Sequence, residues 1–315
     1  MGAASFIAGD WGTSHLRLFL CDAQGATLDS SSGPGVADVK VPFAALFESL
    51  VGPWESRHGM LPAVLCGMVG SNIGWTQTSY IACPAIPQRI MDGCVPLRAG
   101  RVHIVPGARC RNRLDAPDFL RGEETQVLGA LSLDATLRRG RRLLCLPGTH
   151  TKWVVLEDGI IEEFLTAPTG ELFAVLRDHS VLVPDGANAE DVIGGGAFEE
   201  GLKRFNDFPQ AQVLHRLFEC RSRLLGGELA AGSVPAFLSG LLIATDVCGA
   251  LQLFAGSIAE RAVYLIGAPR LMRLYAAALA FQSCGTRQLD GAAAALAGLF
   301  HVRQHISSQI ETHAL

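Results

Sequence analysis

The segment between Asp10 and Arg17 contains residue types that can bind a phosphate group. It reads DWGTSHLR and lies between two apolar runs that are typical of strands. The backbone N–H groups of Gly12 and Thr13 and the threonine hydroxyl can bind phosphate oxygens, while a carboxylate such as Asp10 can hold a hydrated Mg²⁺ ion. The same pattern fits an ordinary hairpin with a polar turn, so this segment alone leaves both interpretations open.

A second turn of this kind lies in the segment LLCLPGTHTKW at 143–153. Gly148 and Thr149 follow its apolar run, and Lys152 comes shortly after them, as a basic residue also follows the first turn. Two such turns favour a clamp on the two ends of a polyphosphate. Lys152 is one of three lysines in the chain, and it is either a phosphate ligand or a solvated lysine at the start of a strand.

Each turn belongs to a repeated order of predicted elements. Strand-like runs lie at 6–8, 16–21 and 27–28 in the first half, and at 143–146, 153–156 and 160–164 in the second. In both halves an acidic turn with glycine joins the second and third runs, and helical and strand-like segments follow. This order predicts an α/β protein with two duplicated domains around a central, ligand-binding cleft. The expected domains are 1–137, completed by a C-terminal helix at 301–315, and 138–300.

Two further segments could contribute to a site. Residues 67–80 form a polar, glycine-rich stretch that is long for a loop without secondary structure, which favours a functional role. Residues 121–131 predict a helix with Glu123 and Glu124 in its first turn, where the helix dipole stabilises negative charge. Neither a Walker A motif nor a GxGxxG fingerprint is present, which argues against P-loop and Rossmann folds.

The composition indicates a globular protein with small-molecule partners. The chain has 315 residues, 18% of them charged, and a net charge of −4, which gives no reason to expect nucleic acid. No uninterrupted apolar run of about 18 residues is present, so no membrane partner is expected. The nine cysteines form no CxxC pairs, which favours a cytoplasmic protein without a zinc site or a disulfide framework.

Several longer segments resemble one enzyme family over nearly the whole chain. They are CGMVGSNIGW at 66–75, RGEETQVLGAL at 121–131, LPGTHTKWV at 146–154, TAPTGELFAVLRDHSVL at 166–182 and LIGAPRLMRLYAAAL at 265–279, together with the turn at 9–17. In these segments the chain resembles the 2-keto-3-deoxygalactonate kinases, also called 2-dehydro-3-deoxygalactonokinases. That family is part of the actin, Hsp70 and sugar-kinase superfamily, which has duplicated ribonuclease H-like ATPase domains.

The resemblance implies ATP and Mg²⁺ as cofactors and assigns residues to them. The first phosphate loop would contain Asp10, Gly12, Thr13 and Arg17, with Asp10 at the metal; the second would contain Gly148, Thr149, His150 and Lys152. Gly267, Ala268 and Arg270 match the turn that receives the adenosine, although the superfamily often has a second glycine where Ala268 lies. Residues 291–298 resemble the small-residue helix at which the two domains hinge.

The implied reaction transfers a phosphoryl group to the 6-hydroxyl of 2-dehydro-3-deoxy-D-galactonate. Such a reaction needs a carboxylate that orients or deprotonates the hydroxyl, and Glu123 and Glu124 are the candidates. The loop residues Gly70, Ser71, Asn72 and Trp75 are the candidate sugar-acid ligands, with a buried structural role as the alternative for Trp75.

Two other functions fit the same fold. A phosphohydrolase would use the glutamate to activate water and would need no sugar acid, and a non-catalytic nucleotide switch would bind ATP without sugar-dependent turnover. The oligomeric state is also open, with a homodimer as the alternative to a monomer.

Overall fold

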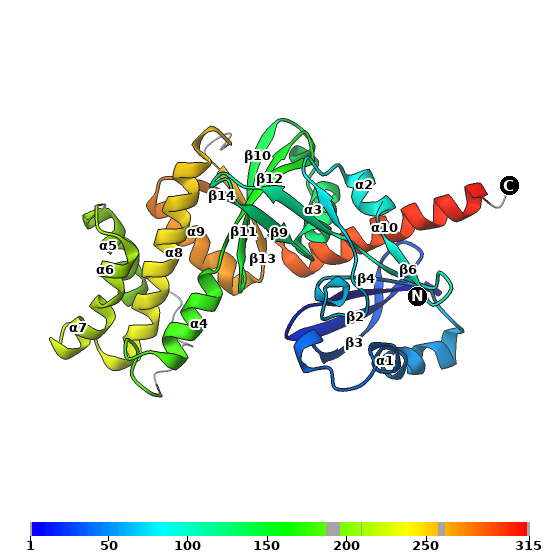
Figure 1. Ribbon diagram of the computed structural model, residues 1–315, viewed down its shortest axis with the longest axis horizontal. Coiled ribbons are helices and arrows are strands. Elements are labelled where there is room, and N and C mark those ends of the chain that lie inside the picture. Colours follow the sequence, from blue (N-terminus) through cyan, green and yellow to red (C-terminus); the bar gives the residue numbers. More distant parts are fainter. Residues whose placement is uncertain (1, 187–195, 209, 258–261, 314–315) are drawn as a thin grey trace. The chain divides into compact units, whose positions relative to one another are not determined.

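The computed structural model describes residues 2–186, 196–208, 210–257 and 262–313 (Figure 1). The chain divides into two compact units. Unit 1 comprises Met1–Gly140, Leu156–Phe164 and Gly291–Leu315, and unit 2 comprises Arg141–Val155 and Leu165–Asp290. Each unit contains most of one large sheet.

The sheet of unit 1 has six strands in the order β3-β2-β1-β4-β7-β6. Their bounds are Ala4–Trp11 for β1, His15–Asp22 for β2, Thr27–Pro34 for β3, Ala63–Cys66 for β4, Val95–Leu97 for β6 and Val102–Ile104 for β7. The first three strands form an antiparallel meander, and β4 runs parallel to β1. Strand β1 lies in the middle of the sheet, where its apolar residues Phe6, Ile7 and Ala8 are buried. Asp10 lies near the carboxyl end of this strand.

Helices cover this sheet. Helix α1 (Phe43–His58) packs Phe47, Val51 and Trp54 into the core beside the meander (Figure 1). A smaller sheet, in the order β5-β8-β9, comprises Tyr80–Ala82, Gly107–Arg111 and Pro117–Leu120, and α2 spans Pro87–Asp92. The Leu156–Phe164 hairpin belongs to unit 1 because Ala85 and Ile161 exchange backbone hydrogen bonds of 2.8 and 3.2 Å.

Helices α3 (Glu123–Leu133) and α10 (Gly291–His313) cross closely within unit 1 (Figure 1). A methyl group added to Gly129 would lie within 3.0 Å of the backbone of Ala294, and one added to Gly298 within 3.0 Å of the backbone of Thr125. The expected boundary at residue 300 is therefore wrong. Residues 291–300 are the first turns of the continuous helix α10, and their small side chains allow close contact with α3 instead of forming a separate element of the second domain.

The second sheet has five strands in the order β12-β11-β10-β13-β14, which repeats the connection order of β3-β2-β1-β4-β7. Their bounds are Arg141–Leu146 for β10, Thr151–Glu157 for β11, Ile160–Ala167 for β12, Ala262–Gly267 for β13 and Gly285–Asp290 for β14. The predicted duplication of the strand order is thus present. Strand β14 was not predicted because its mostly exposed residues, GTRQLD, contain no apolar run.

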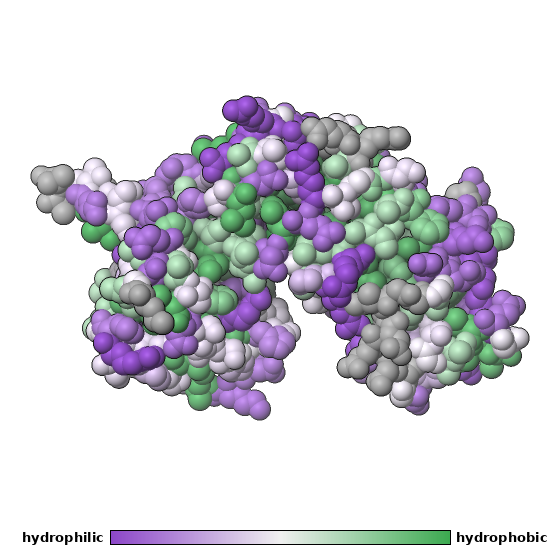
Figure 2. All heavy atoms as spheres, turned by 180° about the vertical axis from the view of Figure 1, so that it is seen from behind, coloured by the Kyte–Doolittle hydropathy of each residue, from purple (hydrophilic) through white to green (hydrophobic). Residues whose placement is uncertain are grey.

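The helices of unit 2 are α4 (Thr169–His179), α5 (Gly196–Asp207), α6 (Val213–Leu217), α7 (Glu219–Leu225), α8 (Val234–Leu253) and α9 (Pro269–Phe281). By length and composition, 231–253 could cross a membrane, but 78% of its most apolar window is buried, so α8 is a core helix. The face drawn in Figure 2 is a mixture of hydrophilic and hydrophobic residues.

Candidate active site

The first Gly-Thr turn joins β1 to β2 in unit 1 and places Asp10 beside Arg17. These residues are cross-strand partners, and the guanidinium of Arg17 donates a hydrogen bond of 2.6 Å to the Asp10 carboxylate. The Asp10 side chain is 20% exposed, so part of it is accessible to a ligand. Arg17, predicted as a phosphate ligand, neutralises Asp10 in this structure. The Gly12 N–H donates to the carbonyl of His15 at 2.9 Å and closes the turn.

Asp10 and the acidic start of α3 meet around two glycines. Gly67 and Gly122 both have positive φ, and a methyl group on Gly122 would lie 3.3 Å from the Cα atom of Gly67. A methyl group on Gly67 would lie 3.4 Å from the Asp10 carboxylate. Burial is the main cause of the raised pKa of the Cys66 thiol, and the negative charges of Asp10 and Glu124 raise this pKa further. The structure therefore brings two of the three predicted acidic residues to one place.

The two adjacent glutamates have different environments. Glu124 is fully buried and accepts hydrogen bonds from the Gly122 N–H at 2.7 Å and the Thr125 hydroxyl at 3.0 Å. Glu123 is partly exposed and accepts a hydrogen bond of 2.9 Å from the Arg121 N–H. Burial, and then the charge of Glu123, raises the pKa of Glu124 to about 8, so Glu124 is mostly protonated at neutral pH.

This raised pKa predicts a pH-dependent contribution to stability. Because the pKa of Glu124 rises from 4.5 to about 8 on folding, its contribution is fully present below pH 4.5 and is lost as the pH rises to about 8. The free energy of unfolding of the wild type, compared with that of Glu124→Gln, should fall by a few kcal/mol across this range. Urea denaturation of both proteins at several pH values measures the difference, and parallel pH profiles would contradict the assignment.

The polar loop after β4 is held in place by Arg121. The guanidinium donates to the Thr78 hydroxyl, to the Thr78 carbonyl at 3.1 Å and to the Tyr80 hydroxyl at 3.3 Å, and it stacks over the Tyr80 ring at 4.3 Å. A methyl group on Gly70 would lie 2.7 Å from the same guanidinium. Arg121 thus connects the loop to the start of α3. This role was not predicted from the sequence, although Arg121 begins the RGEET segment.

The four predicted sugar-acid ligands have unequal access to solvent. Gly70 and Ser71 are buried, while Asn72 is exposed. Trp75 is partly buried and packs against the core, with its ring 5.6 Å from that of Phe47. The packing of Trp75 fits the structural alternative, and the ligand roles of Gly70, Ser71 and Asn72 stay predictions.

The second Gly-Thr turn, between β10 and β11, is fixed by the start of α4. The Glu171 N–H donates to the Thr149 carbonyl at 2.9 Å, and the Glu171 carboxylate pairs with His150 at 2.7 Å. Lys152 is buried at 6% exposure, and its ammonium donates to the Thr166 hydroxyl on β12 at 2.8 Å. The alternative that Lys152 is a solvated lysine at the start of a strand is therefore wrong.

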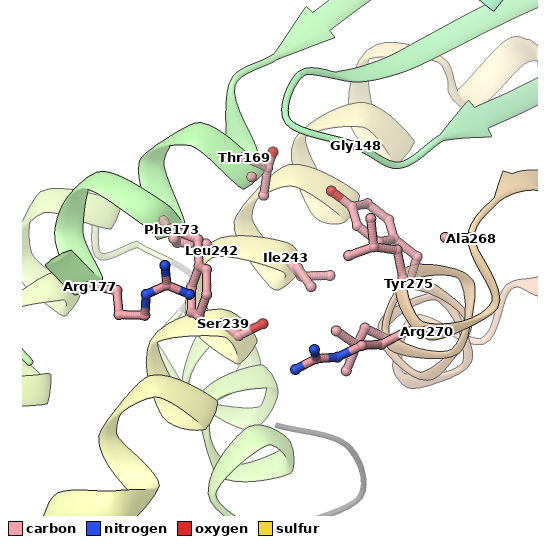
Figure 3. A pocket seen from close by; sticks show the side chains of 13 residues that line it. Gly148, Thr169, Phe173, Arg177, Ser239, Leu242, Ile243, Ala268, Arg270 and Tyr275 are labelled. Carbon is pink, nitrogen blue, oxygen red and sulfur yellow. The ribbon is translucent and has the colours of Figure 1, made fainter. Parts of the chain in front are cut away.

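A pocket of about 330 Å³ lies beside this turn in unit 2 (Figure 3). Three residues predicted for the nucleotide lie in its wall: Gly148, Ala268 and Arg270. Gly267, also predicted, ends β13 just before Ala268. Arg177 of α4 and Arg270 of α9 extend into the pocket from opposite sides (Figure 3).

Most residues of the pocket wall were not predicted from the sequence. The residues not predicted are Thr169, Gly170, Phe173 and Arg177 of α4, Ser239, Leu242 and Ile243 of α8, and Leu271, Leu274 and Tyr275 of α9. Several of them lie in the segments 166–182 and 265–279, which carry the family resemblance. The apolar side chains among them can contact a nucleobase, and the two guanidinium groups can pair with phosphate oxygens.

The repeated sheet order and the two Gly-Thr turns define a class of protein. The chain has the actin-like ATPase fold, which it shares with the activator of the 2-hydroxyisocaproyl-CoA dehydratase from Clostridium difficile with bound ADPNP. That structure superposes with a TM-score of 0.53 over 98% of this chain and 97% of its own, at 10% identity, so the likeness concerns the fold alone.

Sequence comparison identifies the family. The family model described as 2-keto-3-deoxy-galactonokinase matches residues 10–302, and the chain belongs to this family. The “Probable 2-dehydro-3-deoxygalactonokinase DgoK1” of Rhizobium meliloti (strain 1021) is 37% identical over 302 residues, which are 94% of this chain and 96% of the relative. The 2-dehydro-3-deoxygalactonokinase of Escherichia coli (strain K12) is 33% identical over 310 residues, 97% and 99% of the two chains.

A solved structure agrees with this membership. The crystal structure of a candidate 2-dehydro-3-deoxygalactonokinase from Sinorhizobium meliloti superposes with a TM-score of 0.85 at 36% identity, covering 96% of this chain and 99% of its own. The expected fold class and the expected kinase family are confirmed. The protein is a sugar-acid kinase of an ATP-dependent family.

Proposed function

We propose that the protein transfers the γ-phosphoryl group of ATP to the 6-hydroxyl of 2-dehydro-3-deoxy-D-galactonate, which gives the 6-phosphate in galactonate catabolism. The observation that carries this proposal is the approach of Asp10 to the start of α3, the helix that contains Glu123 and Glu124, around Gly67 and Gly122 in a chain of this family. A kinase needs a carboxylate for the metal and a second one for the hydroxyl, and this arrangement supplies both.

Glu123 is the proposed base. A general base must reach the hydroxyl within about 2.6–3.2 Å, and Glu123 is partly exposed whereas Glu124 is fully buried. Because Glu124 is mostly protonated at neutral pH, it adds little negative charge beside Glu123. The pair thus has one carboxylate that can accept the proton of the 6-hydroxyl and one neutral acid that keeps α3 in place.

The residues present fit Mg²⁺ and ATP. In kinases Mg²⁺ is held by one or two carboxylates together with phosphate oxygens, and the partly exposed carboxylate of Asp10 is suited to this role. The adenosine would lie against the apolar side chains of the pocket in unit 2, with Gly148 and Thr149 at the phosphates. When bound, Mg²⁺ neutralises charge on the transferring phosphoryl group.

Asp10→Asn should test the metal role. The amide keeps the shape of the side chain but loses the charge, so we expect kcat to fall by at least about 10²-fold while the melting temperature changes little. The measurement is the rate of ADP release with saturating substrates and varied Mg²⁺. Asp115→Asn is the control, because Asp115 is highly exposed and asparagine tolerates its positive φ. Near-normal kcat in Asp10→Asn would remove Asp10 from the metal site.

A coupled ADP-release assay against a panel of sugar acids tests the reaction itself. We expect turnover with 2-dehydro-3-deoxy-D-galactonate that exceeds turnover with the gluconate epimer, and little ADP release without a sugar acid. Release of phosphate at an undiminished rate without sugar acid would favour a phosphohydrolase, and ATP binding without turnover would favour a switch protein.

The proposed location of the protein is the cytoplasm, and the homodimer stays a prediction.

A further inference from the structure

Asp246 of α8 lies where three other elements of unit 2 meet. Its carboxylate accepts hydrogen bonds from Trp153 Nε1 at 2.8 Å, from the Thr169 hydroxyl at 2.7 Å and from the Tyr275 hydroxyl at 2.6 Å. These donors belong to β11, α4 and α9. The Tyr275 hydroxyl also makes a hydrogen bond of 2.8 Å with that of Thr151, which extends the network along β11.

Both carboxylate oxygens of Asp246 accept hydrogen bonds in this network. Trp153 Nε1 can only donate, and the two hydroxyl donors share the other oxygen of the carboxylate. Burial raises the pKa of Asp246, and the hydrogen bonds from Tyr275, Thr169 and Trp153 oppose this effect. A buried carboxylate that satisfies donors from three elements is costly to disturb, because each lost acceptor leaves a buried donor without a partner.

Two of the donors connect this carboxylate to the nucleotide pocket. Thr169 and Tyr275 both line the pocket, and the Tyr275 hydroxyl points toward the start of α4 (Figure 3). A methyl group on Gly170, the residue after Thr169, would lie within 3.0 Å of the Gly148 carbonyl. The next residue, Glu171, donates its N–H to the Thr149 carbonyl at 2.9 Å. The start of α4 therefore sets the position of the second Gly-Thr turn.

We propose that Asp246 is a positioning residue for nucleotide binding. Its carboxylate fixes the start of α4, the Tyr275 side chain in the pocket wall and strand β11, which follows the second Gly-Thr turn, relative to one another. The inference rests on the proposed function in taking this pocket as the ATP site. Asp246 does not line the pocket itself, so it acts through Thr169 and Tyr275. A purely structural role would lower stability without a selective effect on ATP.

Steady-state kinetics of the full chain separate these roles. In Asp246→Asn the KM for ATP should rise roughly tenfold, and in Tyr275→Phe roughly threefold, because charged and buried hydrogen bonds of these sizes are lost. The KM for the sugar acid, and kcat at saturating ATP, should stay within about twofold. Thr245→Val is the matched control, since the Thr245 hydroxyl donates to the Leu241 carbonyl of its own helix, at 2.8 Å. An unchanged KM for ATP in both variants, or a fall in kcat with both KM values unchanged, would overturn the proposal.

Calorimetric titration of Mg²⁺-ATP without sugar acid separates failure of this inference from failure of the proposed function. If wild type and Asp246→Asn bind ATP equally well, the inference fails while sugar-acid kinase activity is unaffected. If Asp246→Asn weakens ATP binding but wild type phosphorylates no sugar acid, the inference stands and the proposed function fails. If wild type does not bind ATP, both fail. Tyr275→Phe is included because it removes one hydroxyl and leaves the ring in the core.

Discussion

Replacing Glu123 with glutamine is expected to lower kcat by about 10²- to 10⁴-fold, the usual contribution of a general base. Glutamine keeps the size of the side chain and can still accept the hydrogen bond from the Arg121 N–H. It cannot accept the proton of a substrate hydroxyl. The KM for ATP should change little, because the nucleotide pocket lies in unit 2. Single-turnover measurements of sugar-acid phosphorylation would report the loss without a contribution from product release.

Glu124→Gln is the matched control for this prediction. Because Glu124 is mostly protonated at neutral pH, the uncharged amide resembles its native form, and kcat should stay within several-fold of the wild type. The two neighbouring substitutions therefore have opposite expected outcomes. Normal activity in Glu123→Gln together with a large loss in Glu124→Gln would exchange the two roles, and normal activity in both would place the base elsewhere.

Gly298→Ala is expected to destabilise unit 1 by about 2 kcal/mol or more. The added methyl group would overlap the backbone of Thr125 on α3, and neither helix can move freely because Gly129 makes a similar contact one turn away. Overpacking of this kind costs about 1–3 kcal/mol, which exceeds the gain of up to about 1 kcal/mol from replacing a helical glycine with alanine. Since the Thr125 hydroxyl donates to Glu124, a displaced α3 should also lower kcat. Urea denaturation measures the first effect and the ADP-release assay the second.

Gly249→Ala tests whether the close crossing, and not helix propensity, causes the loss. Gly249 lies within α8, and a methyl group added there would lie within 4 Å of no described residue outside its own stretch of helix. This substitution should be neutral or should stabilise the protein by up to about 1 kcal/mol. Equal stability of Gly298→Ala and the wild type would mean that the two helices separate at little cost.

The sequence predicted the elements that have strong local signals. Apolar runs next to glycine turns gave the first strands of both sheets, and the repeat of these runs gave the duplicated strand order. Residues 213–225, in contrast, form two helices, α6 and α7, which meet at Phe218. No glycine or proline marks that break, so the pattern within the segment could not reveal it.

The candidate site was predicted where residue type and motif coincide, and missed where packing decides. Asp10, Gly148, Ala268 and Arg270 lie in or beside the turns that follow β1, β10 and β13, which the sequence marks clearly. The roles of Arg121 and Asp246 depend on partners that are distant in the chain, such as Thr78 for Arg121 and Trp153 for Asp246. A spacing pattern within one segment carries no information on such pairs.

The most direct test of the central claim is the identity of the product. The purified protein is incubated with Mg²⁺-ATP and 2-dehydro-3-deoxy-D-galactonate, and the product is analysed by phosphorus–proton correlation NMR together with mass spectrometry. The account predicts one phosphorylated sugar acid whose phosphorus couples to the two protons on C6. Inorganic phosphate as the only phosphorus product besides ADP, or a phosphate on another oxygen of the sugar acid, would contradict it.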